Sequence, residues 1–254
     1  MIIIKSAADI ERMDAAGRVV EETLTLLENA VCPGICTGDL DAMAAAFIKS
    51  RGGEASFLGY DGYPKSICTS VNSQVVHGIP GRYRLKDGDI LSIDVGVKLN
   101  GFHGDAARTI LIGDVPEEIR QLVEKTKDCF FEGLKAAVIG NRIADISRAI
   151  QYYAESFGYG VVRALIGHGI GRNMHEPPDV PNYWDDRVFG HGVRLQAGMT
   201  LAIEPMINLG TPDVKRLSDG WTMETVDGKP SAHYENTVAL TDNGPRLLTL
   251  HKKD

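Results

Sequence analysis

The chain has 254 residues, of which 43% are hydrophobic and 24% charged, the composition of a globular protein long enough to bury a core. Its 27 basic and 34 acidic residues form no basic stripe, which argues against nucleic acid as a substrate. The start of the chain is too polar for a signal peptide, and no apolar run approaches the roughly 18 residues of a membrane span. Four cysteines without CxxC spacing indicate free thiols, so we expect a cytoplasmic protein that does not contact a membrane.

Four segments carry apolar side chains at every third or fourth position, the spacing of helices that bury one face. Ser6, with Asp9 three residues on, has the pattern of a capping box at the start of the first segment. Gly52-Gly53 and Gly158 are expected to end the second and the fourth. The sequence therefore predicts helices over residues 6–27, 38–51, 116–134 and 143–157.

Between the second and third helices the sequence predicts a β-hairpin with its turn at Asn100-Gly101. This turn would pair Leu99 with Phe102, Asp94 with Ala107, and Gly96 with Asp105. Because side chains alternate between the faces of a strand, Asp94, His103 and Asp105 would share one face. Two carboxylates about 4 Å apart repel by about 4 kcal/mol at a partly buried site, so a divalent cation between them is one interpretation. The alternative is two solvated aspartates on an exposed face.

The second half of the chain weakly repeats the first. Two short motifs recur in the same order, HGI at residues 77–79 and 168–170, and LKDGDILSID at 85–94 as LQAGMTLAIE at 195–204. The repeat predicts one α+β catalytic domain over residues 1–254, with two halves (roughly 1–110 and 111–254) related by a pseudo-twofold axis. A (β/α)₈ barrel would need eight strand–helix units, which the chain does not show.

The repeat also places two further acids. Glu204 corresponds to Asp94, and Glu235, on the strand that returns from Glu204, corresponds to Asp105. Four acids from two symmetric hairpins would then face one another across the axis. The alternative for Glu204 alone is an acid at the end of a strand that Pro205 interrupts.

The stretch GHGIGRNMHEPP (residues 167–178) places His168 and His175 in a segment that is too rich in glycine for a helix and that we expect to be a loop. Glycine lets the backbone approach a ligand, and a neutral imidazole is a common nitrogen ligand for transition metals. Taken singly, each histidine is more typical of a surface or hydrogen-bonded residue. Beside four acids, one histidine becomes a credible ligand, and such a carboxylate-rich set favours Mn, Fe, Co or Zn.

A resemblance to type I methionine aminopeptidases extends over essentially the whole chain. It is carried by FLGYDGYPKSICTSVNSQVVHGIP, DGDILSIDVGVKLNGFHGDAARTI, GHGIGRNMHEPP, MTLAIEPMI and HYENTVAL. The resemblance implies the pita-bread fold, with two related halves around a central antiparallel sheet, and two divalent ions per chain (Co, Mn, Fe, Zn or Ni). In that family's pattern Asp94 binds one ion, His168 and Glu204 bind the other, and Asp105 and Glu235 bridge both.

The resemblance also implies which side chains contact substrate. These are Tyr60, Tyr63, Cys68, His77, Met174, His175 and Trp221. As catalytic groups, Glu204 would accept a proton from the attacking water, His175 would stabilise the oxyanion, and His77 would contact or protonate the leaving nitrogen. Met174 departs from the family, which often has an aromatic residue there, but a thioether is an adaptable pocket wall, so we expect the specificity to survive. Phe57 lies where relatives vary.

The activity implied is removal of the initiator methionine from nascent proteins and peptides with a small second residue. We expect a cytoplasmic monomer in transient contact with the ribosome. An X-Pro dipeptidase or proline aminopeptidase of the same fold is the nearest alternative, although these usually carry an extra N-terminal domain. A pita-bread protein that has lost catalysis and serves as a binding module is another, but such proteins typically lack ligands. His103 shares the acidic face, and nothing in the family pattern makes it a ligand.

Overall fold

The structure is a computed structural model that describes residues 1–251. All four predicted helices are present, and Ser6 is the N-cap of the first, where the side chains and backbone of Ser6 and Asp9 form the predicted capping box. The helices are α1 (Ala7–Ala30), α2 (Thr37–Ser50), α3 (Glu117–Ala136), α4 (Ile143–Ser156) and the short α5 (Asp186–Phe189), with a 3-10 turn η1 (Tyr60–Gly62). Helix α5 was not predicted, since four residues carry no periodic pattern.

The predicted hairpin forms one long antiparallel pair. It consists of β4 (Ile90–Leu99) and β5 (Phe102–Leu111), with β1 (Glu54–Ala55) and β2 (Cys68–Val71) on the other edge of β4. The register is the predicted one, with Leu99 opposite Phe102, Asp94 opposite Ala107, and Gly96 opposite Asp105. Asn100 and Gly101 both have positive φ, as this turn requires.

The second half contributes a five-stranded antiparallel sheet. Its strands lie in the order β15 (Gly244–Leu247), β14 (Asn236–Thr241), β9 (Thr200–Ile203), β7 (Gly167–Gly169) and β8 (Glu176–Val180). The expectation of a loop is wrong for His168, which lies in β7 and pairs with Ala202 of β9. Its glycine neighbours allow this, because a Cβ on Gly167 or Gly169 would meet backbone oxygens of adjacent strands at about 2.5 Å. His175 does lie in the connection between β7 and β8.

Smaller antiparallel sheets lie beside these two. One consists of β13 (Ser231–His233), β10 (Met206–Asn208) and β6 (Gly160–Val161), and the other of β11 (Val214–Arg216), β12 (Met223–Thr225) and β3 (Gln74–Val76). The two halves meet where Ala107 of β5 exchanges backbone hydrogen bonds with Glu235, 3.4 Å and 3.0 Å long. The strands therefore bring the acids of both hairpins to one seam.

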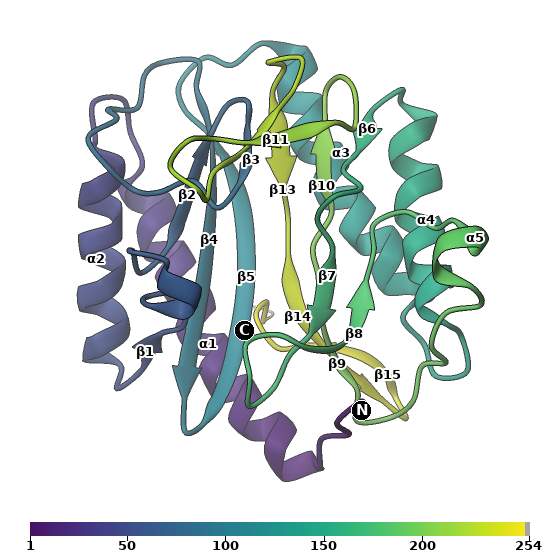
Figure 1. Ribbon diagram of the computed structural model, residues 1–254. Coiled ribbons are helices and arrows are strands. Elements are labelled where there is room, and N and C mark those ends of the chain that lie inside the picture. The colour runs from purple at the N-terminus through teal and green to yellow at the C-terminus, as the bar shows by residue number, and fades with distance from the viewer. Residues whose placement is uncertain (252–254) are drawn as a thin grey trace.

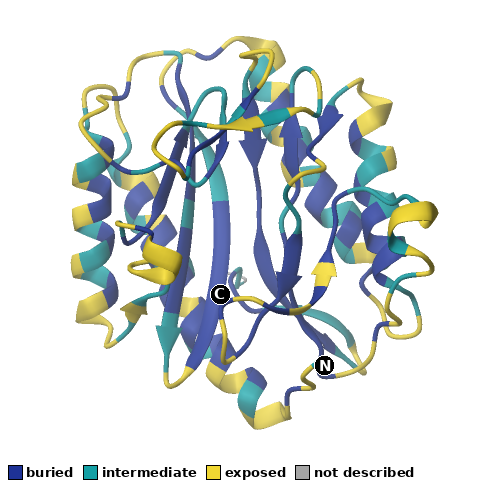
Figure 2. Ribbon diagram, in the orientation of Figure 1, coloured by how far each residue is buried: buried dark blue, intermediate teal, exposed yellow. Residues whose placement is uncertain are grey.

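Helices cover the strands that carry the acids (Figure 1). Figure 1 shows α1 and α3 behind the central strands, with α2 and α4 at the flanks. One apolar cluster joins α1 and α2 to β4 and β5, and another joins α3 and α4 to β9 and β14. Figure 2 shows that the central strands are buried along most of their length. In the described part of the chain, no helix has the length and apolar character needed to cross a bilayer.

Candidate metal centre and substrate cavity

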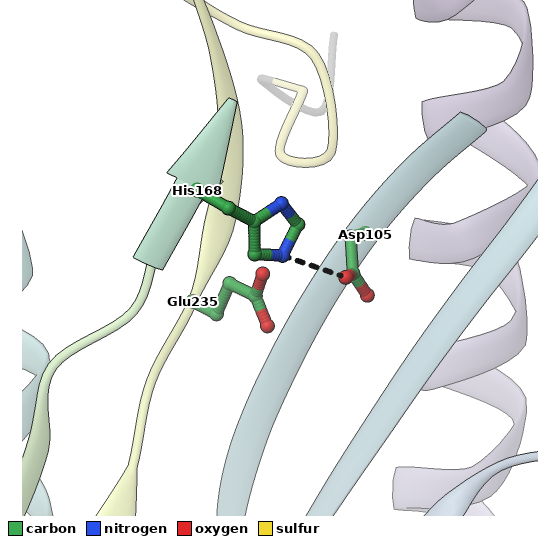
Figure 3. Close-up of side chains that lie close together, drawn as sticks. All are labelled: Asp105, His168 and Glu235. Carbon is green, nitrogen blue, oxygen red and sulfur yellow. Dashed lines mark ion pairs between the residues drawn. The ribbon is translucent and has the colours of Figure 1, made fainter. Parts of the chain in front are cut away.

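Three side chains from distant parts of the sequence converge at the seam between the halves (Figure 3). Asp105 of β5, His168 of β7 and Glu235, between β13 and β14, each offer one donor atom, and these atoms lie within 4.8 Å of one another. Glu204 follows β9 directly, and its Oε1 lies 3.6 Å from Nε2 of His168. Asp94 lies on the same face of the hairpin as Asp105, by the register already described.

His168 is oriented as a neutral ligand. Its Nδ1–H donates to the backbone carbonyl of Gly169 at 2.9 Å, so Nε2 is left with its lone pair. That nitrogen faces Oδ2 of Asp105 at 3.9 Å and Oε1 of Glu204 at 3.6 Å. Burial, with a contribution from the nearby His175, lowers the pKa of His168 to about 3, which keeps the ring unprotonated at neutral pH.

The four acids are crowded and poorly compensated. Burial raises the pKa of Asp94 to about 7. Burial and the charges of neighbouring carboxylates raise the pKa of Asp105, Glu204 and Glu235 well above their ordinary values. Oxygens of Asp94, Asp105 and Glu235 are buried and have no hydrogen-bond partner among the described residues. A divalent cation would satisfy these oxygens and offset the repulsion, so the donor set fits a metal centre.

The centre lines a cavity of about 250 Å³. Every residue that the sequence pattern or the resemblance assigns to the site lines it, namely Tyr60, Tyr63, Cys68, His77, Asp94, Asp105, His168, Met174, His175, Glu204, Trp221 and Glu235. The structure thus brings the predicted site residues together. The part that each one plays in binding or catalysis stays a prediction.

The two histidines that are not predicted ligands lie beside the acids. The ring of His175 is 4.1 Å from that of His168, centroid to centroid, and its Nδ1 is 2.7 Å from the hydroxyl of Tyr60. His77 has φ of 59°, a left-handed conformation that is uncommon for a residue other than glycine and that tends to occur at functional sites. Burial lowers the pKa of His77 to about 4 and also lowers the pKa of His175, so both rings are neutral near pH 7.

The remaining walls are mainly apolar and aromatic. The O–H of Tyr63 points to the backbone carbonyls of Ile67 and Gly78, which accept its hydrogen bond. The ring of Tyr63 packs edge-on against Trp221, with centroids 5.1 Å apart. Cys68 is opposite Asp94 in the β2–β4 register, and burial raises the pKa of its thiol, so it acts as a small uncharged wall. Met174 is 2% exposed and packs in one apolar cluster with Phe57, which also lines the cavity.

His233, which was not predicted from the sequence, also faces the acids. Its Nε2 lies 3.9 Å from Oε2 of Glu204 and 3.8 Å from Oε2 of Glu235, and this buried nitrogen has no hydrogen-bond partner among the described residues. Burial, with His77 nearby, lowers the pKa of His233 to about 3. The signal was available in HYENTVAL, because a residue two positions before Glu235 projects from the same face of an extended chain.

Comparison with known proteins agrees with this geometry. Residues 11–242 match the model of metallopeptidase family M24. The chain belongs to this family. Metallopeptidases of this family use divalent metal ions, and the cluster of Asp105, His168 and Glu235 has the donor atoms to bind one.

Several M24 relatives are similar over almost their whole length. The chain is 56% identical to a methionine aminopeptidase of Clostridium acetobutylicum, over 98% of this chain and 99% of that one. It is 48% identical to methionine aminopeptidase 1 of Bacillus subtilis, again over 98% and 99%. The crystal structure of methionine aminopeptidase from Thermotoga maritima superposes with a TM-score of 0.95 at 41% identity, over 99% and 100% of the two chains.

A more distant neighbour shares the fold alone. Prolidase from Pyrococcus furiosus has a TM-score of 0.74 at 22% identity, and the match covers 99% of this chain but 66% of that one. Together these likenesses confirm the predicted α+β pita-bread fold.

Proposed function

We propose that this M24 metallopeptidase removes the N-terminal methionine from polypeptides with a small second residue, using two divalent ions. The observation that carries the proposal is that the acids and His168 line the same cavity as apolar walls that include Phe57 and Met174. A flexible thioether chain fits such walls, and an exopeptidase needs its hydrolytic groups beside the pocket for the first side chain. The near full-length likeness to methionine aminopeptidases supports the same activity.

The metal ligands in this proposal are the acids and His168. Asp94 would contact one ion, His168 and Glu204 the other, and Asp105 and Glu235 both. Bound divalent ions would acidify a water molecule and polarise the scissile carbonyl. The buried, unpartnered oxygens of Asp94, Asp105 and Glu235 support this assignment.

Proton transfer would then be the task of Glu204. Glu204 lines the cavity with the other acids, and its Oε1 lies 3.6 Å from Nε2 of His168, so its carboxylate would be placed to act as general base toward the attacking water. His77, which is neutral near pH 7 and lines the same cavity, would contact the leaving nitrogen.

His175 would stabilise the oxyanion. Burial raises the pKa of the Tyr60 phenol, so this hydroxyl stays protonated and can donate to Nδ1 of His175. In that arrangement Nε2 of His175 carries the hydrogen and can donate to negative charge on the carbonyl oxygen. Tyr60 therefore selects the tautomer that the reaction needs.

The substrate would be the N-terminus of a newly made polypeptide. We propose a cytoplasmic enzyme that works as a monomer and contacts the ribosome transiently. The net charge of −7 is mildly acidic and argues against a nucleic-acid substrate.

The test is a substrate series with purified protein and added divalent metal. Met-Ala-Ser should release methionine, whereas Leu-Ala-Ser and Pro-Ala-Ser should be nearly inert, because a tight apolar pocket discriminates by shape. Faster cleavage of an X-Pro substrate would overturn the proposal in favour of prolidase activity. Elemental analysis of anaerobically purified protein, followed by metal titration against activity, would establish which ion is used and how many are needed.

A further inference from the structure

We propose that Lys5 is a positioning residue for His175 and that it acts through the buried carboxylate of Glu176. The inference rests on the oxyanion role proposed above for His175, since that role makes the position of the ring matter. It assigns to the segment before α1 a part in the active site, although Lys5 itself does not line the described cavity.

The ion pair between Lys5 and Glu176 is short and excluded from solvent. Nζ of Lys5 lies 2.5 Å from Oε2 of Glu176, and the two side chains are 3% and 1% exposed. The second oxygen of the carboxylate, Oε1, accepts the backbone N–H of Asn173 at 3.1 Å. One carboxylate thus connects the N-terminal segment to the loop of residues 171–175, and this loop ends at His175, the residue before Glu176.

Lys5 is itself fixed by the main chain around it. Its backbone N–H donates to the carbonyl of Gly198 at 2.8 Å, and Nζ also donates to the carbonyl of Ile3 at 3.1 Å. Ser6, the next residue, caps α1, so the backbone has little freedom on either side of Lys5. The cation is therefore held in place before it meets Glu176.

The loop of residues 171–175 packs directly against the ion pair of Lys5 and Glu176. A Cβ on Gly171 would lie 2.5 Å from Cε of Lys5 and 2.8 Å from Oε1 of Glu176. The carbonyl of Gly171 accepts the backbone N–H of His103 at 2.8 Å. The loop is thus held by β5 near its start and by Glu176 at its end.

His175 depends on this anchor because its ring lines the cavity and the backbone that carries it belongs to the loop. The ring keeps its place through Tyr60 on one side and the packing against His168 on the other. Without the cation, a buried carboxylate at residue 176 would be uncompensated and would turn toward water, releasing the N–H of Asn173. A shift of His175 by about 1 Å is enough to cost roughly 100-fold in rate at a reacting centre.

The loop also offers a matched control. Nη2 of Arg172 lies 3.6 Å from Oδ1 of Asp9, but the arginine side chain is 62% exposed. This pair joins the loop to the first turn of α1, yet an exposed pair contributes little. Arg172→Gln therefore removes a cation from the same loop without disturbing the buried anchor.

The experiment compares full-length, metal-loaded Lys5→Met, Lys5→Arg, Glu176→Gln and Arg172→Gln with the parent protein, well below each melting temperature. Lys5→Met should lower kcat for Met-Ala-Ser by about 10-fold to 100-fold, with KM and metal affinity within about twofold. Hydrogen exchange at the Asn173 amide should quicken. Lys5→Arg should recover most of kcat. Glu176→Gln should lower kcat and quicken exchange at Asn173 as Lys5→Met does. Arg172→Gln should have the kcat and the exchange rate of the parent.

A double-mutant cycle distinguishes this inference from the proposed function. In a His175→Ala background, Lys5→Met should lower kcat no further, because the residue to be positioned is gone. The same drop in both backgrounds, or unchanged exchange at Asn173 in Lys5→Met, would overturn the role of Lys5. Full activity of His175→Ala would instead refute the oxyanion role of His175, and quickened exchange would show that the anchor itself exists.

Discussion

His168 and His175 lie with ring centroids 4.1 Å apart, but their nitrogens face different partners. Nε2 of His168 points to the carboxylates of Asp105 and Glu204. Nδ1 of His175 is paired with the hydroxyl of Tyr60. Two adjacent imidazoles therefore have different chemical environments, and the proposed division between metal ligand and oxyanion donor follows from this difference.

Substitution of each histidine should separate the two roles. His168→Ala should reduce metal affinity first, with loss of activity as a consequence. His175→Ala should leave metal affinity largely intact and lower kcat by about 10²–10³, because a donor aimed at charge that forms only in the transition state binds the ground state little. Metal titration by calorimetry, beside steady-state kinetics, measures both quantities.

The outcome for His175 also tests a simpler alternative. If His175 only packs its loop against the neighbouring prolines, His175→Gln should retain most activity. Equal loss of metal in His168→Ala and His175→Ala would place both rings in contact with the ions and refute the division of labour.

The bridging acids should control metal content and activity together. Asp105→Asn and Glu235→Gln replace a carboxylate by a neutral amide, which cannot offset the charge of two cations. Each variant should therefore bind less metal and turn over more slowly, as elemental analysis and Met-Ala-Ser kinetics would show. Full metal content with full turnover in either variant would exclude the predicted cross-hairpin centre. Asp87→Asn, in a hydrogen bond to the backbone of Asp114 away from the cavity, is a suitable control.

The hairpin and its acids could be predicted because their geometry is local. The Asn100-Gly101 turn fixes the register, and the register fixes which face Asp94 and Asp105 share. Glu204 and Glu235 followed from the internal repeat. The position of His168 in a strand could not be read in this way, since it depends on glycine contacts with strands β8 and β9.

Contacts between distant segments were beyond the sequence pattern. Lys5 and Glu176 are 171 residues apart, and no periodicity links a lysine before the first helix to a glutamate in the second half. For His233 the alternation of side chains gives the face shared with Glu235, but not the approach to Glu204. Only the distances to Glu204 and Glu235 show that it faces the acids.

Metal loading should release protons. Burial raises the pKa of Asp94 to about 7 and raises the pKa of Asp105 and Glu204 as well, so at pH 6 the metal-free centre holds protons that a cation must displace. Metal affinity should therefore rise, and the number of protons released should fall, between pH 6 and pH 8. His168 contributes nothing to this release, because its pKa of about 3 leaves it neutral throughout that range.

The release is measured by calorimetry in two buffers of different ionisation enthalpy. A binding heat that is the same in both buffers at pH 6 would contradict the prediction. The gain in melting temperature on metal loading should also be larger at pH 8 than at pH 6, since tighter binding to the native state stabilises it more.

Met174 and Phe57 should together set the size of the pocket. Met174 is 2% exposed and lines the cavity beside Phe57, so Met174→Ala leaves a hole that a longer or branched first residue can occupy. The variant should lose about 2–5 kcal/mol of unfolding free energy. The preference for Met-Ala-Ser over Leu-Ala-Ser should fall by about 10-fold or more, because shape differences of one or two methylenes in an apolar pocket are worth roughly 1–3 kcal/mol. Met174→Leu, which conserves volume, should keep both properties nearly unchanged.

Met13 provides the control that separates pocket shape from stability. It is fully buried in the same apolar cluster, on α1, and is not among the described residues that line the cavity. Met13→Ala should destabilise the protein to a similar degree and leave the ratio of kcat/KM for the two peptides as it is in the parent. Thermal or urea unfolding gives the stability of each variant, and paired kinetics gives the ratio. A fall in the ratio that is equal in Met13→Ala and Met174→Ala would mean that general loosening of the cluster, rather than the wall at residue 174, determines the selectivity for methionine.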